Sequence, residues 1–207
     1  MPEPPPPAAK LSGLLRDLAD APVEAMTLGD LVDGFGPRAF GALLFIFAFA
    51  CALPLPPGTS TLLGAPLVLL SPQVAMGRHS PWLPRSLRRR PLPVAEIRRV
   101  ARSLAGPTVR IERVSGPRLG FMFGPIGERL IGALCTLLSL VLVLPIPLGN
   151  VLPSVAVGAF SLALVQRDGL LALAGYLLTI ASTAVLVVAA HIVVRTARHL
   201  VTVFAGA

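Results

Sequence analysis

The stretch Leu53-Pro54-Leu55-Pro56-Pro57-Gly58 returns later as Leu144-Pro145-Ile146-Pro147-Leu148-Gly149, in equally apolar surroundings. Pro145 follows Pro54 by 91 residues, and at that offset Gly36-Pro37-Arg38-Ala39-Phe40-Gly41 matches Gly127-Glu128-Arg129-Leu130-Ile131-Gly132 without a gap. A repeat at a fixed offset marks two copies of one structural unit. Each unit is predicted to have a Gly-x-Arg-x-x-Gly entry, an apolar helix, and a break made by a double proline and a glycine.

The composition indicates a membrane protein. Of the 207 residues, 54% are hydrophobic and the mean hydropathy is +0.78, whereas about 45–50% apolar residues is usual for a soluble domain. We therefore predict an all-α integral membrane protein with two parallel internal repeats of Pro-broken helix pairs and a C-terminal transmembrane helix.

The arginines indicate how the chain is oriented. Twelve of the seventeen lie between positions 78 and 129, within a net charge of +8, and such a block usually marks a cytoplasmic loop. A nucleic-acid site is disfavoured, because Trp82 alone supplies a stacking ring among the arginines from 78 to 118. The first seven residues do not resemble a signal peptide, so we expect an inner-membrane protein with its N-terminus and Arg-rich segment in the cytoplasm.

Composition shifts divide the chain into successive segments. Apolar residues at helical spacing predict an amphipathic helix over 11–18, Thr27 with Asp30 predicts a capping box, and a basic amphipathic helix is expected to begin near Pro93 and to lie on anionic headgroups. The expected order is a disordered Pro-rich tail (1–10), amphipathic helices and the first membrane repeat (11–76), the Arg-rich segment (77–119), the second membrane repeat (120–166), a transmembrane helix (170–194) and a C-terminal tail (195–207).

The apolar runs before the two breaks are short. Residues 39–53 and 130–144 would each span about 22 Å as a helix, against a hydrocarbon core of about 30 Å. Re-entrant hairpins and short spanning pairs both remain open. In either case the N-terminus, the Arg-rich segment and the turn at 166–169 share one side of the membrane, and the two repeats run parallel.

No catalytic constellation is evident, and we expect no enzyme activity, no metal site and no cofactor. His79, His191 and His199 lack metal-ligand spacing. Cys51 and Cys135 lie inside apolar runs and are interpreted as packing residues.

Arg38 and Arg129, at the heads of the two apolar runs, are the best candidate binding residues. Guanidinium groups suit phosphate, and a pseudo-symmetric pair could converge on one anionic lipid headgroup; snorkelling to the membrane surface is the alternative. Thr59, Ser60 and Asn150 add donors at the helix starts after the breaks, where they could equally be helix caps. The structural helix breaks are Pro54, Pro56, Gly58, Pro145, Pro147 and Gly149.

An ordered set of motifs resembles the exopolysaccharide synthesis protein ExoD family. The set comprises Leu28-Gly29-Asp30-Leu31, both Gly-x-Arg-x-x-Gly entries, both Leu-Pro-x-Pro breaks, Pro81-Trp82-Leu83-Pro84 and Arg167-Asp168-Gly169. The resemblance implies a bacterial inner-membrane protein linked to exopolysaccharide production, and brings no established reaction or site residues.

Polysaccharide export depends on a polyprenyl-phosphate carrier, so the expected function is to support exopolysaccharide synthesis or export by binding or translocating such an anionic lipid. The alternative is a non-transporting accessory protein that docks the synthesis machinery through its Arg-rich segment. The expected partners are membrane lipids, exopolysaccharide synthesis proteins and further copies of the chain, and not nucleic acid. A channel is disfavoured because no acidic ring or polar file lines the apolar runs.

Overall fold

The fold is known from a computed structural model that describes residues 11–21, 25–52, 59–78, 80–116, 120–143 and 150–205. Every regular element in these ranges is a helix, which confirms the all-helical class. The α-helices are α1 (Leu11–Asp20), α2 (Leu28–Phe35), α3 (Ala39–Ala52), α4 (Thr59–Ala75), α5 (Arg85–Arg88), α6 (Val94–Val114), α7 (Pro125–Val143), α8 (Val151–Gln166) and α9 (Gly169–Ala205). Two short 3-10 turns, η1 (Gly36–Arg38) and η2 (Gly120–Phe123), precede α3 and α7.

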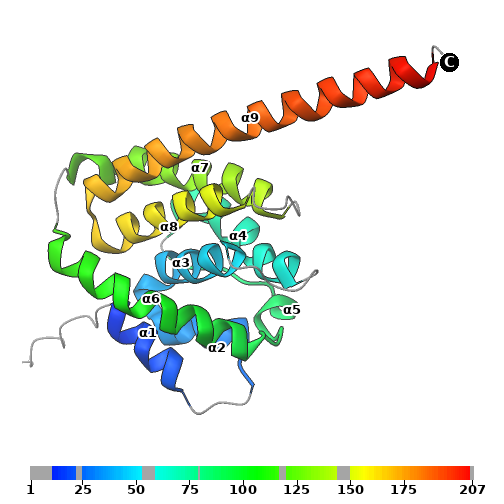
Figure 1. The fold of residues 1–207 in the computed structure, drawn as a ribbon. Helices are drawn as coiled ribbons and strands as arrows, with labels where there is room; N and C mark the ends of the chain where they lie inside the picture. The colour runs from blue at the N-terminus through cyan, green and yellow to red at the C-terminus, as the bar shows by residue number, and fades with distance from the viewer. Residues whose placement is uncertain are drawn as a thin grey trace, which may run out of the picture.

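The apolar helices α3, α4, α7 and α8 form a bundle, and α9 packs along it and then extends well beyond it (Figure 1). Helix α3 packs mainly on α8, and α4 mainly on α7, while contacts within each consecutive pair are fewer. Exchanging α3 with α7 and α4 with α8 leaves this pattern of packing unchanged. The predicted breaks Pro54, Pro56, Gly58, Pro145, Pro147 and Gly149 all lie outside the described residues.

Close contacts at glycines show which helix ends meet. Gly41 near the start of α3 lies against Val165 near the end of α8, and Gly132 in α7 lies against Ala75 at the end of α4. Gly64 near the start of α4 faces Val143, the last residue of α7. Helices α3 and α7 therefore begin where α4 and α8 end, and we call this the arginine end of the bundle.

Helices α1, α2, α5 and α6 form a basic flank beside α3 (Figure 1). The apolar side chains of α6, including Ile97, Val100 and Leu104, are buried, and α6 packs on α1 and α3. The Ser12 hydroxyl donates to the Glu112 carboxylate at 2.6 Å and ties α1 to α6. Both predicted amphipathic helices form, and the apolar face of α6 is covered by protein rather than left for a membrane.

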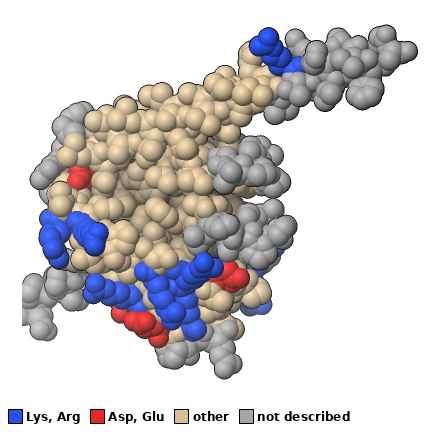
Figure 2. All heavy atoms as spheres, viewed as in Figure 1, with Lys and Arg blue, Asp and Glu red and all other residues tan. Residues whose placement is uncertain are grey.

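Among the described residues, two helices are long and apolar enough to cross a membrane: Pro125–Val143, and Gly169–Ala189 within α9. Their mean hydropathies are 1.9 and 2.2, and only 33% and 17% of these stretches are buried inside the protein. On the face drawn in Figure 2, charged side chains gather over the basic flank, whereas the surface of α7 to α9 is mostly uncharged. Exposed large apolar side chains along α7 and α9 include Leu130, Leu137, Leu140, Leu173, Leu177, Ile180, Val185 and Val188.

Two helices are longer than the sequence pattern predicts. Helix α7 begins at Pro125, because the Gly-x-Arg-x-x-Gly entry is itself helical, and it reaches 19 residues. Helix α9 runs through to Ala205, so 195–205 continue the helix instead of forming a separate tail. Neither glycine nor proline interrupts α9 after Gly175 to end it earlier. Cys51 and Cys135 are free and buried, as expected of packing residues.

Candidate functional site

A pocket of about 250 Å³ opens at the arginine end of the bundle. Its charged lining residues come from η1, from the turn after α4, from the start of α7 and from the turn after α8: Arg38, Arg78, Glu128 and Arg167. Its remaining lining residues are apolar or glycine: Phe40, Gly41, Val74, Gly77, Leu164 and Val165. The pocket thus combines a predominantly basic rim with an apolar wall, and residues from both halves of the chain form it.

Arg38 reaches the pocket through a sharp change of direction between α2 and α3. Gly36 ends α2 with φ +50°, a conformation that side chains rarely adopt, and Pro37 then opens the short turn η1. Arg38 is the last residue of that turn. It therefore stands at the head of α3, as the sequence pattern predicts.

Arg78 is positioned by the C-terminal cap of α4. Gly77 has φ +74°, its N–H donates to the Val74 carbonyl at 2.9 Å, and the Arg78 N–H donates to the Gln73 carbonyl at 3.0 Å. These two bonds form a Schellman motif, which reverses the chain at a helix end. The Gln73 side chain also exchanges two hydrogen bonds with the backbone of Trp82, at 2.7 and 2.8 Å, and so holds the segment that follows Arg78.

Arg129 lies at the edge of the pocket and is not among its lining residues. Its Nε lies 3.3 Å from the position that a Cβ on Gly77 would occupy. Gly77 does line the pocket. A cation beside the last turn of α4 is favourable, because the C-terminal end of the helix dipole is negative.

Arg167 and Glu128 form an ion pair across the pocket mouth, with Nη2 and Oε1 3.6 Å apart. Arg167 adopts the left-handed conformation that ends α8, with φ +52°. The next residue, Asp168, is buried and begins α9: its carboxylate accepts from the Leu170 N–H at 2.9 Å and from the Ser115 hydroxyl at 2.6 Å. Asp168 thus links the C-terminal end of α6 to the turn that contains Arg167.

The remaining candidates lie at the other end of the bundle. Thr59 and Ser60 form the first turn of α4, and Asn150 directly precedes α8. The Asn150 amide donates to the Leu142 carbonyl at 3.4 Å, so it bridges the ends of the α7–α8 connection. Helix α4 is 17 residues long, so about 25 Å separates these donors from the arginine end. The structure therefore does not bring them together with Arg38 and Arg129.

Sequence reasoning missed three charged residues of the pocket: Arg78, Glu128 and Arg167. A usable signal was present, since Arg78 follows the end of α4 by three residues and Arg167 follows the end of α8 by one. Arg78 and Arg167, which follow α4 and α8, therefore lie at the same end of the bundle as Arg38 and Arg129, which lie at the starts of α3 and α7.

In the part of the chain that the structure describes, the fold is all-helical, with two candidate membrane spans and a basic pocket at one end of its apolar bundle. The family model described as "Exopolysaccharide synthesis, ExoD" matches residues 11–188. The chain belongs to this ExoD family, which is linked to exopolysaccharide synthesis, and the resemblance drawn from the motifs is confirmed.

Two curated proteins illustrate the relationship. The chain is 30% identical over 178 residues to Protein ExoD of Rhizobium meliloti (strain 1021), covering 84% of this chain and 72% of that protein. It is 28% identical over 145 residues to the uncharacterized protein slr1875 of Synechocystis sp. (strain ATCC 27184 / PCC 6803 / Kazusa), covering 69% and 68%. No solved structure matches the chain.

Proposed function

We propose that the protein supports exopolysaccharide synthesis or export in the bacterial inner membrane by binding an anionic, polyprenyl-phosphate-like lipid. The lipid headgroup would bind in the pocket at the arginine end of the bundle, which we call the arginine pocket. The observation that carries this proposal is the joint presence of Arg38, Arg78 and Arg167 around one pocket with an apolar wall. Guanidinium groups present planar forks of donors that match phosphate oxygens. Binding and transfer of a lipid need no chemical step, so this function is not enzymatic.

The exposed apolar surfaces of α7 and α9 offer a contact surface for the hydrocarbon chain of the lipid. They start at the arginine end, where α7 and α9 begin, and continue along both candidate spans. A phosphate bound in the pocket would therefore leave its hydrocarbon chain beside surfaces that already suit lipid. The arginine end would face the cytoplasm, on the side to which the arginine-rich residues 78–129 direct it.

The proposed architecture has two parallel repeats, α3–α4 and α7–α8, related by an axis along the bundle. Two equivalent contacts support it: Gly41 contacts Val165, and Gly132 contacts Val74. The two glycines are 91 residues apart, and so are the two valines, which is the offset of the sequence repeat. The pocket lies beside this crossing of the two units, so both contribute to it.

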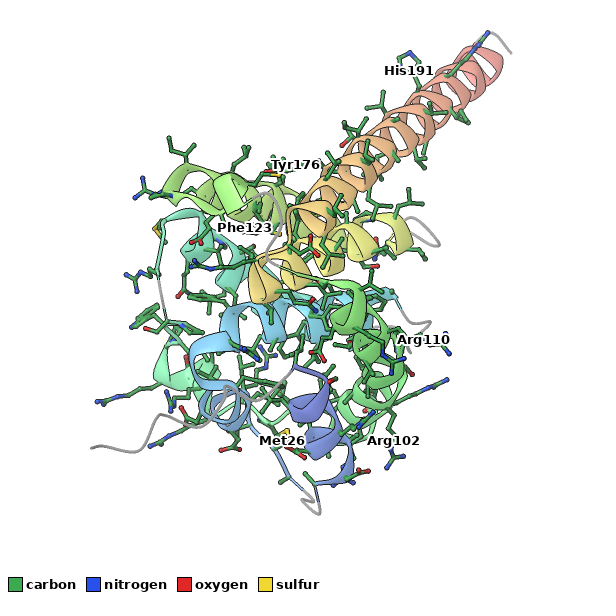
Figure 3. All side chains as sticks on the ribbon, turned by 90° about the vertical axis from the view of Figure 1, so that its left-hand side faces the viewer. Met26, Arg102, Arg110, Phe123, Tyr176 and His191 are labelled. Carbon is green, nitrogen blue, oxygen red and sulfur yellow. The ribbon has the colours of Figure 1, made fainter. Side chains whose placement is uncertain are left out.

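A second candidate function is an accessory one, in which the basic flank docks the synthesis machinery. It is favoured by the outer face of α6, where Arg99, Arg102 and Arg110 are exposed while the apolar face is covered. Figure 3 shows Arg102 and Arg110 projecting outward from α6, away from the bundle.

Exopolysaccharide production in cells that carry matched triple variants separates the two candidates. The pocket variant replaces Arg38, Arg78 and Arg167 with glutamine, and the flank variant replaces Arg99, Arg102 and Arg110. Each removes three positive charges, and both are compared at equal membrane abundance. We expect the pocket variant to lose production and the flank variant to retain it; the reverse result would reject lipid binding in favour of the accessory function.

A further inference from the structure

We infer that the arginine pocket selects a phosphate group with two negative charges, as in a phosphomonoester, over the single charge of a phosphodiester. This inference rests on the proposed function, because it concerns the same pocket. It adds discrimination against phosphodiester lipids and assigns a role to Glu128.

The charges that line the pocket set its preference. Three guanidinium groups and one carboxylate surround a volume of about 250 Å³, which gives two net positive charges. Arg129, beside Gly77, adds a further cation at the edge. A phosphomonoester carries about −1.5 to −2 charges near neutral pH, because its second pKa is about 6, whereas a phosphodiester carries one. The monoester therefore offsets more of the positive charge around the pocket than the diester does.

A bound ligand can replace Glu128 as the partner of Arg167 at a small cost in free energy. Its atoms lie 3.6 Å apart, beyond the 2.7–2.9 Å typical of charge-assisted hydrogen bonds, and the two side chains are 70% and 36% exposed. Exposed ion pairs contribute little stability. A phosphate can therefore take Arg167 from Glu128, while the carboxylate lowers the net positive charge of the pocket and with it the advantage of a dianion over a monoanion.

The number of free phosphate oxygens points the same way. Arg38, Arg78 and Arg167 all line the pocket and can each donate to a phosphate oxygen. A monoester entering with its phosphate first offers three terminal oxygens to the rim, whereas a diester offers two and must also accommodate its second ester group. Charge and the number of free phosphate oxygens thus favour the same headgroup.

The test is equilibrium binding to the full-length protein in neutral detergent at about pH 8, where a phosphomonoester is fully dianionic. The probes are dioctanoyl phosphatidic acid, a monoester, and dioctanoyl phosphatidylglycerol, a diester. We expect the wild type to bind the monoester about tenfold more tightly, a difference of about 1.4 kcal/mol. Inorganic phosphate serves as a third, soluble probe.

A series of pocket charges makes the test specific. Arg78→Gln lowers the net charge by one and is expected to reduce the monoester preference, while Glu128→Gln raises the net charge by one and is expected to increase it. Arg99→Gln, on the outer face of α6, removes the same charge away from the pocket and leaves the preference unchanged. Loss of folding cannot produce changes in both directions.

Equal affinity for the two lipids, with both still weakened by Arg78→Gln, would overturn the selectivity and leave lipid binding intact. Binding of both lipids that is indifferent to Arg38→Gln and Arg78→Gln would overturn the proposed function as well. If inorganic phosphate binds as tightly as phosphatidic acid, the preference for a dianion stands and the lipid as its source is rejected.

Discussion

Gly41 of α3 lies so close to Val165 of α8 that a side chain at position 41 would collide with the valine methyl group. At the 91-residue offset, a Cβ on Gly132 of α7 would lie 2.7 Å from the backbone carbon of Val74 in α4. These two contacts bring α3 to α8 and α7 to α4. Gly41, Val165 and Val74 also line the arginine pocket.

Gly41→Ala is expected to destabilise the bundle, because α3 and α8 must separate or Val165 must shift. Overpacking of this kind costs about 1–3 kcal/mol. Thermal unfolding in detergent measures the loss. In Gly106→Ala, which meets no atom within 4 Å, the midpoint should not fall. The double variant Gly41→Ala/Val165→Ala should recover part of the loss, and simple additivity of the two changes would contradict the contact.

Gly77→Ala should destabilise the protein for two separable reasons. The backbone at φ +74° costs a residue with a Cβ about 1–2 kcal/mol, and the new methyl group would press on Arg129. In an Arg129→Ala background only the backbone cost remains, so the same substitution should be milder there. Identical unfolding shifts in the two backgrounds would show that Arg129 does not press on Gly77.

Asp168→Asn should weaken the junction of α6 and α9. The carboxylate accepts from the Ser115 hydroxyl, the Gly116 N–H and the Leu170 N–H, and hydrogen bonds to charged groups are each worth about 1.5–3 kcal/mol. Ser115→Ala removes only one of these bonds and is expected to cost less. The order of the unfolding midpoints, wild type above Ser115→Ala above Asp168→Asn, is the result to look for; a reversed order of the two variants would reject the role of Asp168.

The capping box of α2 should make stability depend on pH. The backbone N–H and the hydroxyl of Thr27 both donate to Asp30, at 2.8 Å each, and these bonds hold the pKa of Asp30 below its usual value. A lowered folded-state pKa stabilises the protein above the unfolded value of about 3.9, and the benefit is lost as pH falls through the folded value. The stability of wild type relative to Asp30→Asn should therefore be constant from pH 7 to 5 and shrink below about pH 4. A constant difference down to pH 2 would contradict this.

Local features could be predicted from the sequence because neighbouring residues determine them. The capping box at Thr27, the start of α6 after Pro93 and the buried face of α6 all follow from short-range patterns. What covers that face could not be predicted, since an amphipathic helix shows the same periodicity whether it packs on a membrane or on α1. Leu11 and Leu15 of α1 are fully buried because of tertiary packing, which the periodicity of α6 does not specify.

The composition of the pocket could be predicted only in part. Arg38 stood out because it belongs to the repeated entry motif. Arg78 and Arg167 did not, because they reach the pocket through the left-handed residues that end α4 and α8 and through packing between helices far apart in the sequence. The association of Thr59 and Asn150 with the arginines failed to anticipate that α4 and α8 begin at the opposite end of the bundle from the starts of α3 and α7.

The most direct test of lipid binding is the lipid phosphate that copurifies with the protein from native membranes. Wild type is compared with the triple glutamine variant of Arg38, Arg78 and Arg167, and with the matched triple variant of Arg99, Arg102 and Arg110. We predict that the pocket variant loses its bound phospholipid-phosphate while the flank variant retains the wild-type amount. Equal retention by both variants would contradict the assignment of the arginine pocket as the binding site.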